Sequence, residues 1–234
     1  MASRSWKKII LGLIFLILSI LYTILFFNKA SFGETMTFNI AHLKSLSNVL
    51  VSPINFDFWN HTGSQMNLFS PWLTILTGWM FVQFNVIYGF SVYLTIVTFL
   101  TLVSAYFFMN KFHKDTFEAL LFAIGYTFSL NRLLLVFSNQ RLENYLVLIF
   151  LPMVYFGAYQ FFTNHAWKTL VWGEALIVWT SPYVAIAVAA TLVVAFVLMP
   201  FSRLSHSWNY VKKTSLNVLK VISMGVITTI GFIG

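Results

Sequence analysis

Continuous apolar runs of about 20 residues recur along this chain and constrain its fold more than any other feature. Runs of this length match the thickness of a bilayer, where no water satisfies the backbone, so each must form a helix or part of a closed barrel. The runs do not alternate in polarity, which favours helices. Hydrophobic residues make up 59% of the chain and charged residues 9%, a balance outside the range of soluble domains. We therefore predict an all-α, polytopic transmembrane bundle whose partner is the lipid bilayer.

The first apolar run, residues 9–27, follows a basic stretch and has the outline of a signal peptide. It is longer than a typical signal-peptide core, and no small-residue cleavage site follows it, so we predict a retained anchor with a cytoplasmic N-terminus. Residues 28–85 are predicted to form a long extracytoplasmic loop that ends in an interfacial, juxtamembrane helix at 70–83. That segment is apolar but short for a span, and Pro71 suits the first turn of a helix.

Residues 86–234 are predicted to hold the remaining spans of a single transmembrane domain that covers residues 1–234, about seven spans in all. The expected spans are 86–109, 117–137, 145–162, 169–180, 183–199 and 216 onward. Pro182 separates two of them and predicts a turn or break at that point. The last apolar run reaches Gly234 without a polar flank, so we expect the C-terminus to be incomplete.

Lysine and arginine residues set the orientation of a membrane protein, because they collect in cytoplasmic loops. If the helix at 70–83 does not cross the membrane, ten lie inside: Arg4, Lys7, Lys8, Lys111, Lys114, Lys168, Arg203, Lys212, Lys213 and Lys220. Four lie outside: Lys29, Lys44, Arg132 and Arg141. This imbalance favours the non-crossing arrangement in the cell membrane. The same basic residues form short clusters between apolar runs, so the net charge of +8 does not indicate a nucleic-acid partner.

The chain carries no phosphate-binding glycine loop, nucleophile elbow or dinucleotide fingerprint. It has no cysteine and five scattered histidines, so we predict neither a metal site nor a cofactor. In the long loop, Asn39 and His42 fall on one side of an expected helix over 37–50, where they would suit a phosphate or a sugar. The alternative is an amphipathic surface helix with solvated polar groups. Asp57 is a candidate general base or an ordinary solvated loop acid.

Arg141 and Glu143 lie at the expected outer mouth between the third and fourth spans, with Arg132 a little earlier. Arginine there would hold a lipid phosphate bidentately, or it would extend to the interface with no specific partner. Glu174 falls in the short fifth span, where an ionisable group is a functional candidate, and Lys168 is its expected partner if it pairs near the interface.

Two stretches carry a family resemblance. The first is His42 in the long loop, followed by the segment Phe69, Ser70, Pro71 that opens the interfacial helix. The second runs from Arg141 to Tyr159, and its matching residues are Arg141, Glu143, Pro152 and Gly157. With the order of anchor, long loop and many spans, these residues resemble the bacterial YfhO-type membrane proteins. More distantly, they are similar to the GT-C superfamily of glycosyltransferases, which use polyprenyl-phosphate-linked sugars.

The resemblance implies inverting glycosyl transfer in the assembly of a cell-envelope polysaccharide or glycolipid. A carboxylate, Asp57 or Glu34, would activate the acceptor, and four residues would contact the donor: Asn39, His42, Arg141 and Glu143. The chain departs from the family at Phe38, which stands where an acid usually precedes His42 by four residues. It departs again at Pro182, where the family often has the histidine of a Ser-His pair.

These departures keep a second hypothesis open, a non-catalytic, truncated membrane protein that binds lipid or partner subunits. A transporter is the third, although no internal repeat is detected.

Overall fold

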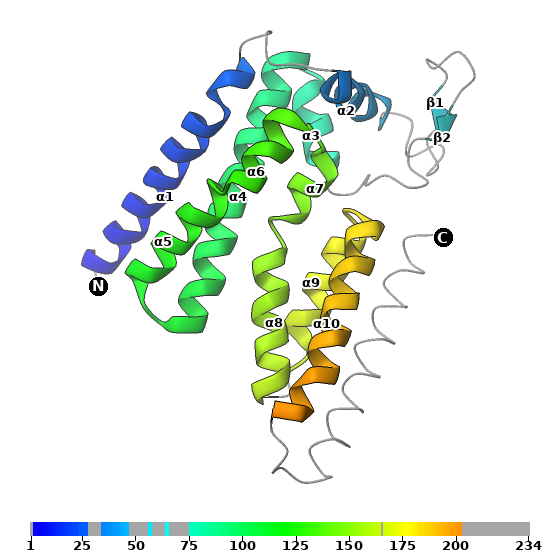
Figure 1. Cartoon of the computed structure of the whole chain (residues 1–234). Helices are drawn as coiled ribbons and strands as arrows, with labels where there is room; N and C mark the ends of the chain where they lie inside the picture. The colour runs from blue at the N-terminus through cyan, green and yellow to red at the C-terminus, as the bar shows by residue number, and fades with distance from the viewer. Residues whose placement is uncertain are drawn as a thin grey trace. The chain divides into compact units, whose positions relative to one another are not determined.

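The computed structural model describes residues 2–27, 34–46, 56–57, 64–65, 75–164 and 166–202. Within these ranges the chain is almost entirely helical (Figure 1). Among the described residues, three helical segments are long and apolar enough to cross a membrane: Lys8–Phe27, Val86–His113 and Thr116–Ser138. The expected helical, membrane-associated character of the chain is confirmed at this level, while the count of about seven spans stays a prediction.

The chain divides into two compact units, Met1–Ile149 and Phe150–Gly234. The helical elements of the first unit are α1 (Ala2–Thr23), η1 (Ile24–Phe27), α2 (Glu34–Ser45), α3 (Leu76–Val82), α4 (Val86–His113), α5 (Thr116–Thr127), α6 (Leu130–Leu133), the π-helical η4 (Leu134–Ser138) and α7 (Leu142–Val147). Its two short strands, β1 (Phe56–Asp57) and β2 (Ser64–Gln65), pair antiparallel. The second unit contains α8 (Leu151–Asn164), α9 (Lys168–Val178) and α10 (Pro182–Ser202).

Helix α4 is the centre of the first unit and packs against α1, α3 and α5 (Figure 1). A stripe of buried hydroxyl side chains runs along α4, at Ser91, Thr95, Thr98 and Thr101. Ser91 Oγ donates to the carbonyl of Phe26 at 2.7 Å, and the hydroxyl of Thr95 lies 2.6 Å from that of Thr23. Hydroxyl groups between apolar helices hold them together in lipid, where water cannot compete. Ser91 and Thr95 therefore fasten η1 and α1 to α4.

Helices α3 and α4 approach each other closely at Gly89. A Cβ atom at this position would overlap the backbone carbonyl of Phe81, so no larger residue fits without moving α3. Asn85 lies between the two helices and caps α4, because its side chain accepts from the backbone N–H groups of Ile87 and Tyr88, each at 3.1 Å. The expected interfacial helix at 70–83 is thus helical from Leu76 to Val82, and residues 70–74 lie outside the described residues.

The expected span 117–137 is confirmed as the apolar segment Thr116–Ser138, but neither it nor the expected span 145–162 is one uninterrupted α-helix. The first is divided into α5, α6 and η4, and the second into α7 and α8. Pro152 explains the second break, since it has no N–H to donate to the carbonyl of Leu148 and suits only the first turn of α8. Instead, Tyr126 Oη donates to the carbonyl of Leu148 at 2.9 Å, and Ser104 Oγ donates to the carbonyl of Ile149 at 2.6 Å.

In the second unit, α8 and α9 pack at close range through glycine. A Cβ atom at Gly157 would lie 2.6 Å from the backbone nitrogen of Leu170, and one at Gly173 would lie 2.7 Å from a methyl carbon of Val154. Helix α10 begins at Pro182, which confirms the break predicted at that residue. The last expected span, from residue 216, lies outside the described residues.

Candidate functional site

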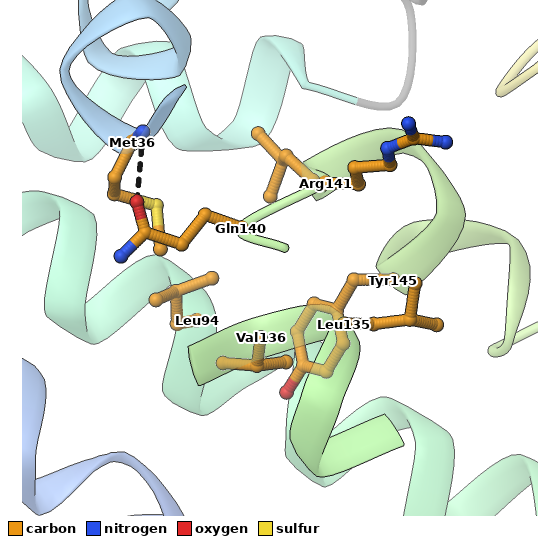
Figure 2. A pocket seen from close by; sticks show the side chains of 8 residues that line it. Met36, Leu94, Leu135, Val136, Gln140, Arg141 and Tyr145 are labelled. Atoms are coloured by element: carbon orange, nitrogen blue, oxygen red, sulfur yellow. Dashed lines mark hydrogen bonds between the residues drawn. The ribbon is translucent and has the colours of Figure 1, made fainter. Parts of the chain in front are cut away.

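Helix α2 is joined to a turn about 100 residues later in the chain, and two hydrogen bonds to Gln140 make this junction. The backbone N–H of Met36 donates to Gln140 Oε1 at 3.2 Å (Figure 2), and Asn39 Nδ2 donates to the carbonyl of Gln140 at 2.9 Å. Gln140 has a left-handed φ of 50°, an uncommon conformation for a residue with a side chain. We call this contact the α2–Gln140 junction.

A small open hollow with a cavity volume of about 10 Å³, roughly the space of one water molecule, lies under the junction (Figure 2). Its walls are mainly apolar side chains from α2, α4, η4 and α7, together with the turn at Gln140. The lining residues are Met36, Leu94, Leu135, Val136, Gln140, Arg141, Leu142 and Tyr145. Most ligand sites share this combination of apolar walls and a few polar groups, but this hollow is far smaller than a typical ligand pocket.

The predicted donor-contact residues differ in their exposure. Asn39 is half-buried and bonded to Gln140, whereas Arg141 is exposed and its guanidinium points away from Gln140 in Figure 2. His42 is only 5% exposed, so the alternative of a helix with solvated polar groups is wrong at this residue. Glu143 is half-buried in the first turn of α7. The structure therefore brings Asn39 to the turn that carries Arg141, and it keeps His42 inside.

The two predicted catalytic acids have defined backbone positions only. Glu34 is the first residue of α2, and Asp57 lies in β1. Their side chains lie outside the described part of the chain. Residues 69–74, which include the segment Phe69, Ser70, Pro71, also lie outside it. The role of either acid stays a prediction.

Arg132 departs furthest from its predicted position. At the outer mouth it was expected to hold a lipid phosphate or extend to the interface, but it is 1% exposed in the interior of the first unit. Its Nη2 donates to Thr101 Oγ1 at 2.8 Å, and its Cζ lies 4.3 Å from the ring centroid of Tyr145. Nε and Nη1 are buried without a hydrogen-bond partner. The arginine turns inward because the hydroxyl stripe of α4 and an aromatic ring offer it partners there.

Tyr145 connects this buried arginine to the rest of the site. Its hydroxyl group is hydrogen-bonded to the hydroxyl of Thr98 on α4, and the residue is 1% exposed. The centroid of the Tyr22 ring on α1 lies 5.9 Å from Arg132 Cζ. The buried Tyr22 hydroxyl interacts with the guanidinium but forms no hydrogen bond of standard geometry. Arg132, Thr101, Tyr145 and Tyr22 are hereafter the Arg132 cluster. Its sequence signal was an arginine inside an apolar run, which marks a functional candidate by default.

Glu174 in α9 was expected to pair with Lys168 if it lay near the interface. Among the described residues no ion pair joins the two, and Lys168 is exposed while Glu174 Oε1 is buried without a hydrogen-bond partner. Residues six positions apart do not share a helix face, which explains the difference. Glu174 keeps its standing as an ionisable group inside an apolar unit.

No group of three histidine, aspartate or glutamate residues in the described ranges is placed to hold a metal ion. No protein-family model, no curated protein and no solved structure matches this chain. The resemblance to the YfhO-type and GT-C proteins therefore rests on the residues named for it, and it stays a prediction.

Proposed function

We propose that this chain is a membrane-embedded, GT-C-like glycosyltransferase-related protein that binds a polyprenyl-phosphate-linked sugar at the α2–Gln140 junction. About seven spans, an N-terminus in the cytoplasm and a junction on the outer side of the membrane belong to the same proposal. The substrate would serve the assembly of a cell-envelope polysaccharide or glycolipid.

The juxtaposition of α2 with the Arg141 turn is the observation that supports this proposal best. The sequence singled out these segments separately, and the bond from Asn39 Nδ2 to the carbonyl of Gln140 joins them at 2.9 Å. Asn39 supplies an amide at the junction and Arg141 an exposed guanidinium beside it. Together they provide a neutral polar group suited to a sugar and a cation suited to a phosphate.

Binding of polyprenyl phosphate to the full chain in lipid nanodiscs tests the role of Arg141. Loss of one charge-assisted hydrogen bond predicts that Arg141→Ala weakens binding about tenfold. Lys111→Ala is the matched control, because Lys111 is an exposed cation near the other end of α4 and should change affinity less than about twofold. Equal affinities for wild type and Arg141→Ala would remove Arg141 from the proposed site.

Catalysis is the second part of the proposal and needs its own assay. Glu34 or Asp57 would deprotonate the acceptor hydroxyl, which then displaces the lipid phosphate from the sugar. We expect the double variant Glu34→Ala, Asp57→Ala to abolish sugar transfer from a polyprenyl-phosphate sugar while retaining lipid binding. Transfer that survives in this variant would exclude both residues as the base.

One observation favours the alternative, a non-catalytic protein that binds lipid or a partner subunit. Phe38, at the position where the resemblance places an acid, is 49% exposed on α2. An exposed phenyl ring suits contact with lipid and offers no general base. Single-turnover assays separate the two proposals, because the alternative predicts polyprenyl-phosphate binding without any sugar transfer.

A further inference from the structure

The Arg132 guanidinium has more hydrogen-bond donors than the described residues satisfy. Nη2 bonds to Thr101, while Nε and Nη1 are buried and have no partner. No ion pair to Arg132 is formed among the described residues. An arginine inside an apolar bundle normally pairs with an anion or lines a polar cavity, because an uncompensated buried charge is strongly unfavourable.

The groups that face Arg132 are neutral. Thr101 from α4 gives it a hydroxyl oxygen, and the rings of Tyr145 and Tyr22 lie 4.3 Å and 5.9 Å from its Cζ. Ring faces attract the cation, but they leave its N–H donors without acceptors. The buried hydroxyl of Tyr22 interacts with the guanidinium but forms no hydrogen bond of standard geometry. The hydroxyl oxygens of Thr101 and Tyr22 are the acceptors beside Arg132, and they are fewer than its N–H donors, two nitrogens of which stay unpaired. An anion would supply the missing acceptors.

Tyr145 joins the cluster to the hollow under the α2–Gln140 junction. Its ring contacts Arg132 and also lines the hollow, together with Leu135 and Val136 from η4. Those two residues follow Arg132 by three and four positions, about one helical turn. The segment between them and the arginine changes from α-helix to π-helix, a form that is rare and concentrated at functional sites.

We propose that the Arg132 cluster is an anion site for a phosphate group that enters through the hollow. The ring of Tyr145 separates the hollow from the guanidinium of Arg132. The bond from Tyr145 to Thr98 holds the ring in place when the site is empty. Guanidinium favours phosphate because its planar donors match tetrahedral oxygens, and a low-dielectric interior strengthens the attraction. The phosphate belongs to a lipid headgroup or is free phosphate. The first source rests on the proposed function, and the second does not.

Binding of three probes to the full chain in neutral-lipid nanodiscs tests this site. The probes are polyprenyl phosphate, the uncharged polyprenol of the same length, and inorganic phosphate. We expect Arg132→Gln to weaken phosphate-dependent binding about tenfold, as loss of a charged hydrogen bond predicts. Lys111→Gln removes the same charge from an exposed position and should change affinity less than about twofold.

Each outcome decides a separate point. Binding of polyprenyl phosphate that exceeds polyprenol binding and depends on Arg132 supports a lipid headgroup as the source. Arg132-dependent binding of inorganic phosphate alone supports the anion site and contradicts the proposed function. Equal affinities for wild type and Arg132→Gln overturn the Arg132 site, and the proposed function survives if polyprenyl phosphate still binds. Wild type that binds neither phosphate probe overturns both.

A measurement on the wild-type chain covers the case in which Arg132→Gln does not fold. Hydrogen–deuterium exchange is followed with and without the phosphate probe that binds. The site predicts slower exchange across residues 130–147, which contain Arg132, η4 and Tyr145, and unchanged exchange in α8. Exchange that stays the same across 130–147 while the probe is bound contradicts the proposal.

Discussion

Asn39 is a single side chain that fastens α2 to a turn far along the chain. Its Nδ2 donates to the carbonyl of Gln140 at 2.9 Å, and Asn39→Ala removes that bond. We expect the α2–Gln140 junction to lose about 1 kcal/mol, which raises amide exchange in α2 about fivefold. Thr35→Ala, at an exposed position of the same helix, is the control. If both variants exchange alike, the hydrogen bond does not hold α2 in place.

Arg132 and Arg141 show what a sequence pattern cannot decide about a residue. They lie nine positions apart near the outer end of one predicted span, and the same expectation applied to both. Arg141 is exposed and Arg132 is 1% exposed. The difference comes from Thr101, Tyr22 and Tyr145, which reach Arg132 from other helices. Partners distant in sequence leave no trace in local periodicity.

The contact between α3 and α4 depends on the absence of a side chain at Gly89. Because a Cβ atom there would overlap the carbonyl of Phe81, we expect Gly89→Ala to destabilise the first unit by about 1–3 kcal/mol. Gly125→Ala in α5 is the control, since no atom lies within 4 Å of its added Cβ. That variant should gain up to about 1 kcal/mol through helix propensity. Thermal unfolding in detergent compares them, and equal melting temperatures would contradict the close approach.

The start of α4 depends on the cap at Asn85. Its side-chain oxygen accepts from Ile87 and Tyr88, so we expect Asn85→Ala to cost about 1 kcal/mol and Asn85→Asp to cost little. Urea or thermal unfolding of the two variants measures the difference. A loss of equal size in both would show that the amide serves some purpose other than capping.

Helix ends were predictable where proline sets them and unpredictable where tertiary contacts do. Pro182 identified the start of α10 from the sequence alone. Pro152 carried the same signal for α8. At the break before it, Tyr126 and Ser104 from other helices donate to the carbonyls of Leu148 and Ile149, and these contacts left no local signal in the sequence. The division of the third expected span into α5, α6 and η4 follows no proline or glycine rule.

For the whole molecule, apolar run length and composition were sufficient to predict a helical membrane protein. They did not predict two compact units, because the division after Ile149 falls inside one apolar run and depends on contacts within each unit. They also missed the hydroxyl stripe of α4, whose serine and threonine residues are too weakly polar to interrupt an apolar run. The segments that form the candidate site were predicted from the sequence, but the burial of Arg132 was not.

We propose that the first unit crosses the membrane, with α2 on the outer side and the turn after α4 on the cytoplasmic side. The 28 residues of α4 measure about 42 Å, enough to span a bilayer. Because the chain has no cysteine, single exposed cysteines can be introduced as Ala41→Cys in α2 and Lys114→Cys after α4.

Labelling of these two variants with a membrane-impermeant maleimide is the most direct test. We predict that Ala41→Cys reacts in intact cells and that Lys114→Cys reacts only after the membrane is permeabilised. Labelling of both variants in intact cells, or of Lys114→Cys alone, would contradict the account.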